Sequence, residues 1–334
     1  MFKNKKILIT GGTGSLGQNL TKRLLKKNVE SIRIFSRNEN KQVLMRNEFQ
    51  DDRLRFLIGD IRDKERLARA FEDIDIVFHT AALKHIDLIE YNPSEAIKTN
   101  ILGSQNVIDT ALNQNIHTVV GIGTDKAVSP LNTYGATKLV MEKLFVSANH
   151  LTGKKYQTRF FPLRYGNVVA SSGSVIPKFI NQIKNQKEIT ITDPEMTRFS
   201  ISMDEALNFI LNCVQKSQGG EVFIPKLKAY KISMIEDALK EILGNFKVKN
   251  ISKRPGEKKH ETLISENELE YTLESKEDYM IIESHYSFGF KISKIPKHFK
   301  DYKKTSLKEE YSSDKAKLMT KKELIKIILN TKLI

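Results

Sequence analysis

The feature that most constrains the fold is a glycine-rich turn between a short apolar strand and a helix. Residues 6–10 are typical of a buried strand, and residues 16–25 have the apolar periodicity of a helix. Between them, Gly11, Gly14 and Gly17 recur at every third position. Glycines at such a junction permit a tight turn and a close approach of the free N–H groups of the helix to a phosphate. The pattern predicts an α/β, Rossmann-like doubly wound parallel sheet that binds a dinucleotide.

The turn and the end of the next strand define the expected cofactor site. The turn residues expected to contact the cofactor are Gly11, Gly12, Thr13, Gly14, Ser15, Leu16 and Gly17. The second strand, residues 31–35, leads into Ser36 and Arg37, where a site that prefers NAD usually carries an acidic residue. Ser36, Arg37 and Lys41 offer donors and positive charge to a 2′-phosphate, which predicts NADP. The alternative is that Arg37 and Lys41 are only exposed residues of the following helix.

Two further strands, residues 54–58 and 75–78, end in polar and small residues. The carboxyl ends of parallel strands open onto one crevice, which is the usual ligand position. Asp60 and Ile61 are expected to flank the adenine. The other cofactor contacts expected from the first half of the chain are Thr80, Ala81, Ala82, Lys84, Asn100 and Ile122.

Reactive side chains follow a buried strand in the middle of the chain. The apolar run of residues 118–122 predicts the strand, and Thr124, Asp125 and Lys126 come soon after it. Neighbouring side chains on a regular strand point to opposite faces, so these residues can reach one ligand only where the strand has ended. Gly123 favours such an end.

Tyr134 and Lys138 bring a phenol and an ammonium to the same region. They stand four residues apart at the start of a helix expected to run to about residue 151, which puts both on one face. A protonated Lys138 favours the tyrosinate, so we expect the pKa of Tyr134 to fall below its reference of about 10. Tyr134 can then act as a base near neutrality.

The composition is that of a globular protein without a membrane span. Of the 334 residues, 40% are hydrophobic, and we find no apolar run of the about 18 residues that a bilayer requires. The first residues lead directly into a strand, so we expect no signal peptide. The single cysteine, Cys213, falls in the apolar pattern of a helix and is expected in the core. One cysteine permits no internal disulfide, which suits a cytoplasmic protein.

Much of the net charge of +15 lies at the C-terminus. Residues 291–334 hold 13 lysines and 5 acidic residues, a net charge of +8. Because this segment has no nucleic-acid motif, we expect a solvated surface and no nucleic-acid partner. Its last helix, residues 321–329, is basic and amphipathic and is expected to pack on its own domain or on a neighbouring subunit, with membrane contact as the alternative. We find no metal-binding cluster in the sequence.

We expect two interleaved domains and an extension. The segments are residues 1–166 for the cofactor-binding domain with residues 199–230 returning to it, residues 167–290 mainly for the substrate-binding domain, and residues 291–334 for a basic C-terminal extension. Strands at residues 157–164 and 246–251 and a helix at residues 229–244 are the expected elements of the second half.

Several motifs together resemble a known family. Those that resemble the extended short-chain dehydrogenase/reductases acting on nucleotide sugars are Gly11-x-x-Gly14-x-x-Gly17, Asp60, Thr80-Ala81-Ala82, Thr99-Asn100-Ile101-x-Gly103, Thr124 and Tyr134-x-x-x-Lys138. Further motifs are similar to the soluble inverting UDP-N-acetylglucosamine 4,6-dehydratases, among them Thr124-Asp125-Lys126-Ala127, Arg164-Tyr165-Gly166-Asn167-Val168, Met196-Thr197-Arg198-Phe199 and Arg254-Pro255-Gly256-Glu257-Lys258. The resemblance covers nearly the whole chain.

The resemblance implies a reaction and the groups that carry it. UDP-N-acetylglucosamine would become UDP-2-acetamido-2,6-dideoxy-β-L-arabino-hex-4-ulose, a step toward pseudaminic acid, on a tightly bound NADP that is recycled. Tyr134 would take the C4 hydroxyl proton, Thr124 would hold the C4 oxygen, and Lys138 would bind the ribose. The C4 ketone acidifies C5, so that water can leave across C5 and C6. A homo-oligomer, hexamer or dimer, is also implied.

Asp125-Lys126 departs from the Asp-Glu pair of the retaining glucose dehydratases in this family. The resemblance assigns Lys126 as the base at C5 and Asp125 as the acid at the C6 hydroxyl. For Lys126 to be a free base near pH 7, its pKa must fall from about 10.4 toward about 7–8, which burial and the like charge of Lys138 favour. We therefore expect a lowered pKa at Lys126.

The second half is expected to hold the nucleotide sugar. The expected substrate contacts are Lys84, Thr124, Asn167, Ser174, Val175, Thr192, Arg198, Arg254 and Glu257, and Val168 is expected to touch the cofactor. Arg198 and Arg254 suit a bidentate contact with a diphosphate, and Glu257 suits ribose hydroxyls.

Two other classes of function stay open. One is a related enzyme acting on another nucleotide sugar, either a GDP-linked amino-sugar dehydratase or a UDP-sugar 4-epimerase, although an epimerase has no use for an acid–base pair after Thr124. The other is an NADP-binding regulator without turnover, a class that usually loses the Tyr134 or Lys138 present here.

Overall fold

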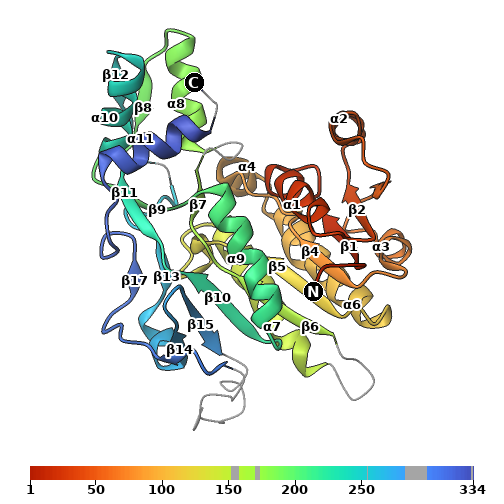
Figure 1. The fold of residues 1–334 in the computed structure, drawn as a ribbon. Helices are drawn as coiled ribbons and strands as arrows, with labels where there is room; N and C mark the ends of the chain where they lie inside the picture. The colour runs from red at the N-terminus through yellow and green to blue at the C-terminus, as the bar shows by residue number, and fades with distance from the viewer. Residues whose placement is uncertain (152–157, 170–173, 254, 283–298, 332–333) are drawn as a thin grey trace.

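The structure is a computed structural model that describes residues 1–151, 158–169, 174–253, 255–282, 299–331 and 334. Its largest sheet has ten strands, in the spatial order β16 (Lys303–Lys304), β14 (Thr272–Glu274), β15 (Asp278–Ile282), β10 (Glu221–Pro225), β6 (Arg159–Leu163), β5 (Thr118–Ile122), β4 (Ile76–His79), β1 (Lys6–Thr10), β2 (Ser31–Ser36) and β3 (Leu54–Ile58) (Figure 1). The strands from β3 to β10 run parallel, and β15, β14 and β16 add an antiparallel edge. The predicted α/β fold is confirmed.

Helices cover both faces of this sheet. The helices on one face are α1 (Ser15–Leu25), α2 (Glu39–Phe49) and α9 (Met203–Lys216), and those on the other are α3 (Lys64–Phe71), α6 (Gly103–Asn113) and α7 (Thr133–Ser147). Alternation along β1 explains the two layers, since Ile7 and Ile9 pack with α1 whereas Leu8 packs on the opposite face. Cys213 of α9 lies in the core between the sheet and the helices α1, α2 and α9, as predicted.

The connection between β4 and α6 begins with a loop, residues 80–85, and is helical from Ile86 on except at Asn92. Its elements are α4 (Ile86–Tyr91), α5 (Pro93–Ala96) and a π-helix, η1 (Ile97–Leu102). The helix α7 ends in a short 3₁₀ turn, η3 (Ala148–His150), close to the predicted boundary.

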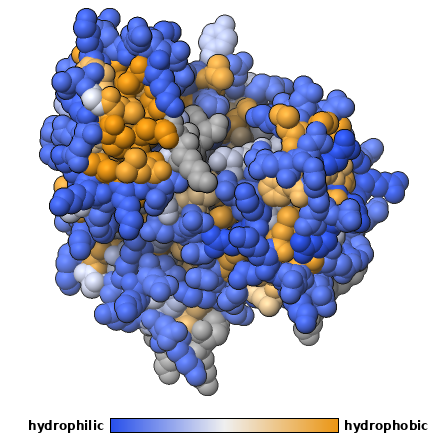
Figure 2. All heavy atoms as spheres, turned by 45° about the horizontal axis from the view of Figure 1, so that its top comes forward, coloured by the Kyte–Doolittle hydropathy of each residue, from blue (hydrophilic) through white to orange (hydrophobic). Residues whose placement is uncertain are grey.

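A smaller unit packs at one end of the sheet (Figure 1). Its strands pair as β11 (Lys228–Lys231) with β9 (Thr197–Ile201) and β7 (Asn167–Val168), as β12 (Val248–Asn250) with β8 (Ile189–Ile191), and as β13 (Thr262–Ile264) with β17 (Tyr311–Ser312). A 3₁₀ helix, η4 (Glu266–Tyr271), follows β13. Its helices are α8 (Val175–Lys184), α10 (Ile232–Leu243) and α11 (Lys321–Asn330), whose apolar faces form a separate core. The basic helix α11 packs on its own domain, as expected, and Figure 2 shows apolar side chains gathered over this unit.

The observed strand pairing differs from the expected segments in two places. Within residues 199–230 only β10 joins the large sheet, whereas β9 and β11 form the small one. The strands β14 and β15, expected in the substrate-binding segment, extend the large sheet instead, because the apolar residues of β15 are buried against β10.

The described residues contain neither a membrane-spanning helix nor a metal-binding cluster. No helix in this part of the chain has the length and apolar character needed to cross a bilayer. The same residues contain no group of three or more His, Cys, Asp or Glu side chains placed to hold a metal ion.

Candidate functional site

The glycine turn after β1 has the shape that a dinucleotide needs. Gly11 has a φ of +67°, and a Cβ on Gly17 would lie 2.5 Å from the carbonyl oxygen of Gly12, so α1 can pack this close only without a side chain there. Gly14 precedes α1 and offers no side chain to cap it. The first N–H groups of α1 therefore remain available to an anion, which fits a cofactor pyrophosphate.

A hydroxyl, two cationic side chains and a carboxylate lie at or near the end of β2. The Ser36 hydroxyl accepts a hydrogen bond of 3.0 Å from Gln42, which leaves its own proton to donate. Arg37 and Lys41 are exposed, and the guanidinium of Arg37 lies 3.7 Å from the carboxylate of Asp60. These positions fit the expected contacts with the cofactor ribose, which stay predictions.

Asn100 of η1 braces the loop that follows β4. Its side-chain oxygen accepts from the backbone N–H of Leu83 at 2.8 Å, and its amide donates to the Leu83 carbonyl at 3.0 Å and to the Thr137 hydroxyl at 3.1 Å. The buried amide thus joins the loop containing Thr80 to the helix α7. This bracing places the loop, and a direct contact of Asn100 with the cofactor stays a prediction.

The reactive residues after β5 lie on a turn. β5 ends at Ile122, and a 3₁₀ turn, η2 (Asp125–Ala127), follows with Thr124 as its cap. The strand has therefore ended before Thr124, which was the condition for neighbouring side chains to reach one ligand. A Cβ on Gly135 would lie 2.2 Å from the Lys126 carbonyl oxygen, so this glycine lets the start of α7 pack on the turn.

Lys126 is held by three acceptors. Its Nζ lies 3.0 Å from Asp125 Oδ1, 3.2 Å from Glu261 Oε1 and 3.3 Å from Asn167 Oδ1. An ammonium has three N–H donors, so these partners satisfy it completely. Both carboxylates are buried, and each keeps one oxygen, Asp125 Oδ2 and Glu261 Oε2, without a hydrogen-bond partner.

The expected fall in the pKa of Lys126 is wrong for this structure. Burial acts to lower the pKa, but the charges of Asp125 and Glu261 outweigh it and hold the pKa above its ordinary value. Burial, together with the charge of Glu261, raises the pKa of Asp125 against the opposing effect of Lys126. The resting pair is therefore an ammonium beside a carboxylate that readily takes up a proton.

The expected fall in the pKa of Tyr134 is wrong as well. Burial raises the pKa of Tyr134, while the charge of Lys126 and a hydrogen bond with Thr124 act to lower it. Lys138 points elsewhere, since its Nζ donates to the Ile122 carbonyl at 2.6 Å and lies 3.0 Å from the Met141 sulfur. Burial lowers the pKa of Lys138 to about 8.

A short hydrogen-bonded chain leads inward from Tyr134. The phenol is hydrogen-bonded with the Thr124 hydroxyl, which in turn donates to Asp125 Oδ1 at 3.1 Å. A proton on Tyr134 therefore has a direct path through one hydroxyl to a buried carboxylate.

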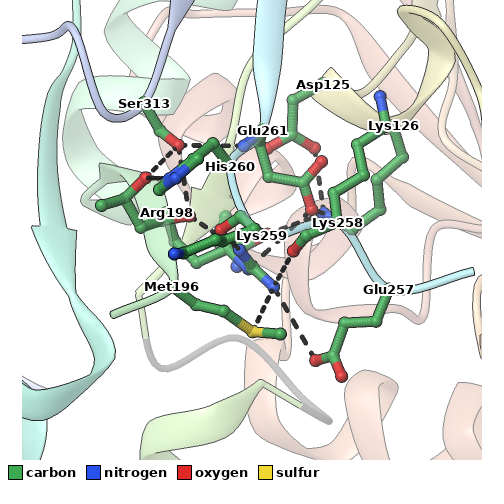
Figure 3. A network of polar contacts seen from close by, with 12 residues as sticks. Asp125, Lys126, Met196, Arg198, Glu257, Lys258, Lys259, His260, Glu261 and Ser313 are labelled. Carbon is green, nitrogen blue, oxygen red and sulfur yellow. Dashed lines mark hydrogen bonds and ion pairs between the residues drawn. The ribbon is translucent and has the colours of Figure 1, made fainter. Parts of the chain in front are cut away.

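A cavity of about 90 Å³ lies beside Lys126. The predicted residues that line it are Lys126, Asn167, Arg198 and Glu257. Arg198 is buried and donates to the carbonyls of Lys258 and Lys259, both at 3.0 Å, so much of its guanidinium is already engaged (Figure 3).

Other expected substrate residues lie apart from this cavity. Ser174 and Val175 are at the start of α8, and the Thr192 hydroxyl lies 3.6 Å from the Met196 sulfur. Arg254 lies outside the described residues. The structure therefore brings together four of the expected catalytic residues, Thr124, Asp125, Lys126 and Tyr134, and part of the expected nucleotide set, whereas Lys138 points elsewhere.

Glu261 was not predicted from the sequence, and Lys258 was quoted only as part of the motif that ends at this residue, without a role in the site. Both belong to the 256–261 segment, which crosses the mouth of the site (Figure 3). The segment is fixed where Asn132 donates to the Gly256 carbonyl at 2.9 Å and where Lys258 donates to the Val128 carbonyl at 2.5 Å. The one available signal was an acidic residue directly before the apolar Thr262–Ile264 strand.

Comparison with known proteins gives a consistent result. The sequence profile described as "Polysaccharide biosynthesis protein" matches residues 7–284. An inverting UDP-N-acetylglucosamine 4,6-dehydratase of Campylobacter jejuni is 46% identical, with 99% of each chain covered. A UDP-glucose 4-epimerase of Rickettsia akari is 39% identical, with 98% of this chain and 96% of that protein covered.

A solved structure agrees over the whole length. The X-ray structure of Pen from Bacillus thuringiensis has a TM-score of 0.92 and 38% sequence identity, and the match covers 100% of both chains. Together with the glycine turn and the Tyr134–Lys138 spacing, these matches place the chain in the polysaccharide biosynthesis protein family of extended short-chain dehydrogenase/reductases.

Proposed function

We propose that the protein is a hydro-lyase, an inverting UDP-N-acetylglucosamine 4,6-dehydratase. The observation that carries this proposal is the Asp125–Lys126 pair, held 3.0 Å apart beside Thr124 and Tyr134 at the end of β5. Besides a nicotinamide to accept the hydride, oxidation at C4 needs only the tyrosine as its base, whereas loss of water across C5 and C6 needs an additional acid and base. The similarity to the Campylobacter jejuni dehydratase supports the same function.

Tyr134 serves the oxidation at C4. It takes the C4 hydroxyl proton as its own proton passes through Thr124 to Asp125, along the chain whose last contact measures 3.1 Å. The charge of Lys126 favours the phenolate during this transfer. Thr124 keeps the C4 oxygen in place.

Lys126 and Asp125 serve the elimination. Asp125 is already a carboxylic acid because it holds the proton from Tyr134, and release of one proton from the partly exposed Lys126 to solvent leaves a neutral amine 3.0 Å from it. The amine takes the proton from C5, whose electron pair moves toward the C4 ketone, and the acid protonates the departing C6 hydroxyl. The raised pKa of Asp125 favours it as the acceptor of the Tyr134 proton.

We propose NADP as the cofactor. Bound at the glycine turn, its nicotinamide would supply a temporary electron acceptor for C4 that is restored within one turnover. Ser36, Arg37 and Lys41 suit a 2′-phosphate, because a hydroxyl donor and one cation lie at the end of β2 and a second cation lies on the first turn of α2. Release of the nucleotide from purified protein and its identification by mass test this choice, and recovery of NAD alone would refute it.

A UDP-sugar 4-epimerase is the second candidate. The 39% identity with a Rickettsia akari UDP-glucose 4-epimerase favours it, and such an enzyme also uses oxidation at C4. The two functions differ in product mass. We expect incubation with UDP-N-acetylglucosamine to yield a product lighter by one water, whereas a product of unchanged mass would show an epimerase.

We also propose a cytoplasmic homo-oligomer, a dimer or a hexamer. The family resemblance supports assembly, and the apolar surface over the small unit is compatible with it (Figure 2). Light scattering during size exclusion measures the subunit number, and a monomer at micromolar concentration would contradict this part of the proposal.

A further inference from the structure

One buried oxygen atom bridges two cations beside the site. Oε1 of Glu261 lies 3.2 Å from the Nζ of Lys126 and 3.8 Å from the Nε of Arg198. Figure 3 shows the carboxylate between the side chains of these two residues and next to Asp125. Without this anion, the positive charges of Lys126 and Arg198 would face each other, a repulsion that acts to lower the pKa of Lys126.

The backbone of Glu261 is rigidly held. Its N–H donates to the Ser313 hydroxyl at 2.9 Å, and its carbonyl accepts from the Ser313 N–H at 2.8 Å. The same serine hydroxyl lies 2.6 Å from the hydroxyl of Thr197, at the start of β9. A buried carboxylate on a backbone held in this way, with Oε2 unpartnered, needs a reason beyond packing.

We propose that Glu261 is a positioning residue for the elimination: its carboxylate orients the Lys126 amine beside Asp125 and sets the pH range in which this pair holds the single proton that it needs. The inference rests on the proposed dehydratase function. In the working state, one proton is shared by Lys126 and Asp125, while Glu261 keeps its negative charge against Arg198. The pair then contains one base and one acid, and the net charge of the cluster does not change when the proton moves between them.

The effect of Glu261 on this pair has a definite sign. Its charge raises the pKa of both Lys126 and Asp125. Interacting groups titrate as a pair, so both limbs of a bell-shaped pH profile belong to the Lys126–Asp125 unit. Loss of the Glu261 charge therefore moves both limbs to lower pH.

Other titratable groups also face the Lys126–Asp125 pair. They are Tyr134 on α7, Arg198 on β9, Tyr230 on β11 and Lys258 on the 256–261 segment. The two cations act to lower the pKa of Lys126, and the tyrosines are neutral because burial raises the pKa of each. The negative charges that oppose these cations and raise the pKa of Lys126 are those of Glu261 and Asp125.

The test compares Glu261→Gln with the wild type. Glutamine keeps an oxygen that can accept from Lys126 but removes the charge. We expect the pH profile of kcat to move to lower pH by about one unit or more, because a full charge close to hydrogen-bonding distance is lost. Glu261→Asp should restore the wild-type profile in part, and an unshifted profile in Glu261→Gln would overturn the proposal.

Glu257→Gln is the matched control. Glu257 lies on the same segment, 3.7 Å from Arg198, and it lines the same cavity. Its loss should raise KM and leave both limbs of the kcat profile in place. An equal shift in this variant would show that any charge lost from the segment has the same effect, which would also overturn the specific role of Glu261.

A second readout does not depend on the proposed reaction. The Lys126 side chain is 19% exposed, so an amine-directed reagent can reach it, and mass spectrometry reports the extent of labelling at that residue as a function of pH. Glu261→Gln should lower the labelling pKa of Lys126, and an unchanged labelling pKa would contradict the inference. If the wild type makes no dehydrated product while this shift is seen, the proposed function fails and the role of Glu261 in holding the Lys126 proton stands.

Discussion

Replacement of Lys126 by Met tests the acid–base pair and the electrostatics of the cluster together. The Nζ removed by this change lies 3.0 Å and 3.2 Å from two buried carboxylates, Asp125 and Glu261. Loss of one partner from a buried ion pair typically lowers the free energy of unfolding by about 3–5 kcal/mol. Asp125 can relieve part of this loss, because without the cation its pKa rises further and it takes up a proton.

The sign of the pH dependence follows from that proton. An aspartate whose folded-state pKa lies above its unfolded value binds more protons when folded, so its contribution to stability falls as the pH rises between the two values. Lys126→Met should therefore lose about 3 kcal/mol or more at pH about 8 and clearly less at pH about 5. Urea unfolding at the two pH values measures this difference. A larger loss at the lower pH would refute the electrostatic reasoning.

The same variant should separate the two chemical steps. Loss of a general base lowers a rate by about 10²–10⁴, so elimination should fall by that factor. Oxidation at C4 should slow by less, because Tyr134 and Thr124 remain and only the favourable charge of Lys126 is missing. We expect a 4-keto sugar that keeps its C6 hydroxyl, detected by mass, together with reduced nicotinamide absorbance. Lys143→Met, on the exposed side of α7, is the matched control, and full elimination activity in Lys126→Met would refute the assignment.

Three other predictions follow from the geometry. Tyr134→Phe should reduce C4 oxidation by about 10²–10⁴, because the proton acceptor is lost, so that neither reduced nicotinamide nor C5 exchange with solvent appears; exchange at the wild-type rate would disprove the role of Tyr134. Arg164→Met should lower the free energy of unfolding by about 3–5 kcal/mol, since it leaves the buried carboxylate of Glu142 and the partly buried carboxylate of Glu268 without their cation; an unchanged urea midpoint would contradict this. Burial lowers the pKa of His79 to about 3, so the unfolded chain binds one more proton than the folded protein at this residue between pH about 3 and about 6.5, and stability should fall by up to about 1.4 kcal/mol per pH unit as the pH decreases through that range. His79→Gln should remove this contribution, and an identical acid slope in the variant would show that the His79 interpretation is wrong.

The fold was largely predictable because its signals are local. The alternation of apolar strands with amphipathic helices, and the glycines at the first turn, determine how β1 to β6 pair. The small sheet was missed because β7 has two residues and β9 carries buried polar side chains such as Arg198, so neither gives a clear alternating pattern. Their partners lie far away along the chain.

The site was predictable only in part, for a related reason. Thr124, Asp125, Lys126 and Tyr134 are close in sequence, and the structure brings them together at the end of β5. Glu261 comes from a distant segment and decides the charge balance. The pKa of Lys126 is a small difference between large opposing effects of burial and charge, so one unseen carboxylate was enough to reverse the expected direction.

The most direct test of the central claim is the reaction of the wild type with UDP-N-acetylglucosamine in heavy water. In the proposed elimination, the Lys126 amine removes the C5 proton next to a transient C4 ketone. A product that has lost one water and carries deuterium at C5, observed by proton NMR, is the predicted result. A dehydrated product that keeps only protium at C5 would contradict the account, because elimination would then have proceeded without exchange through Lys126.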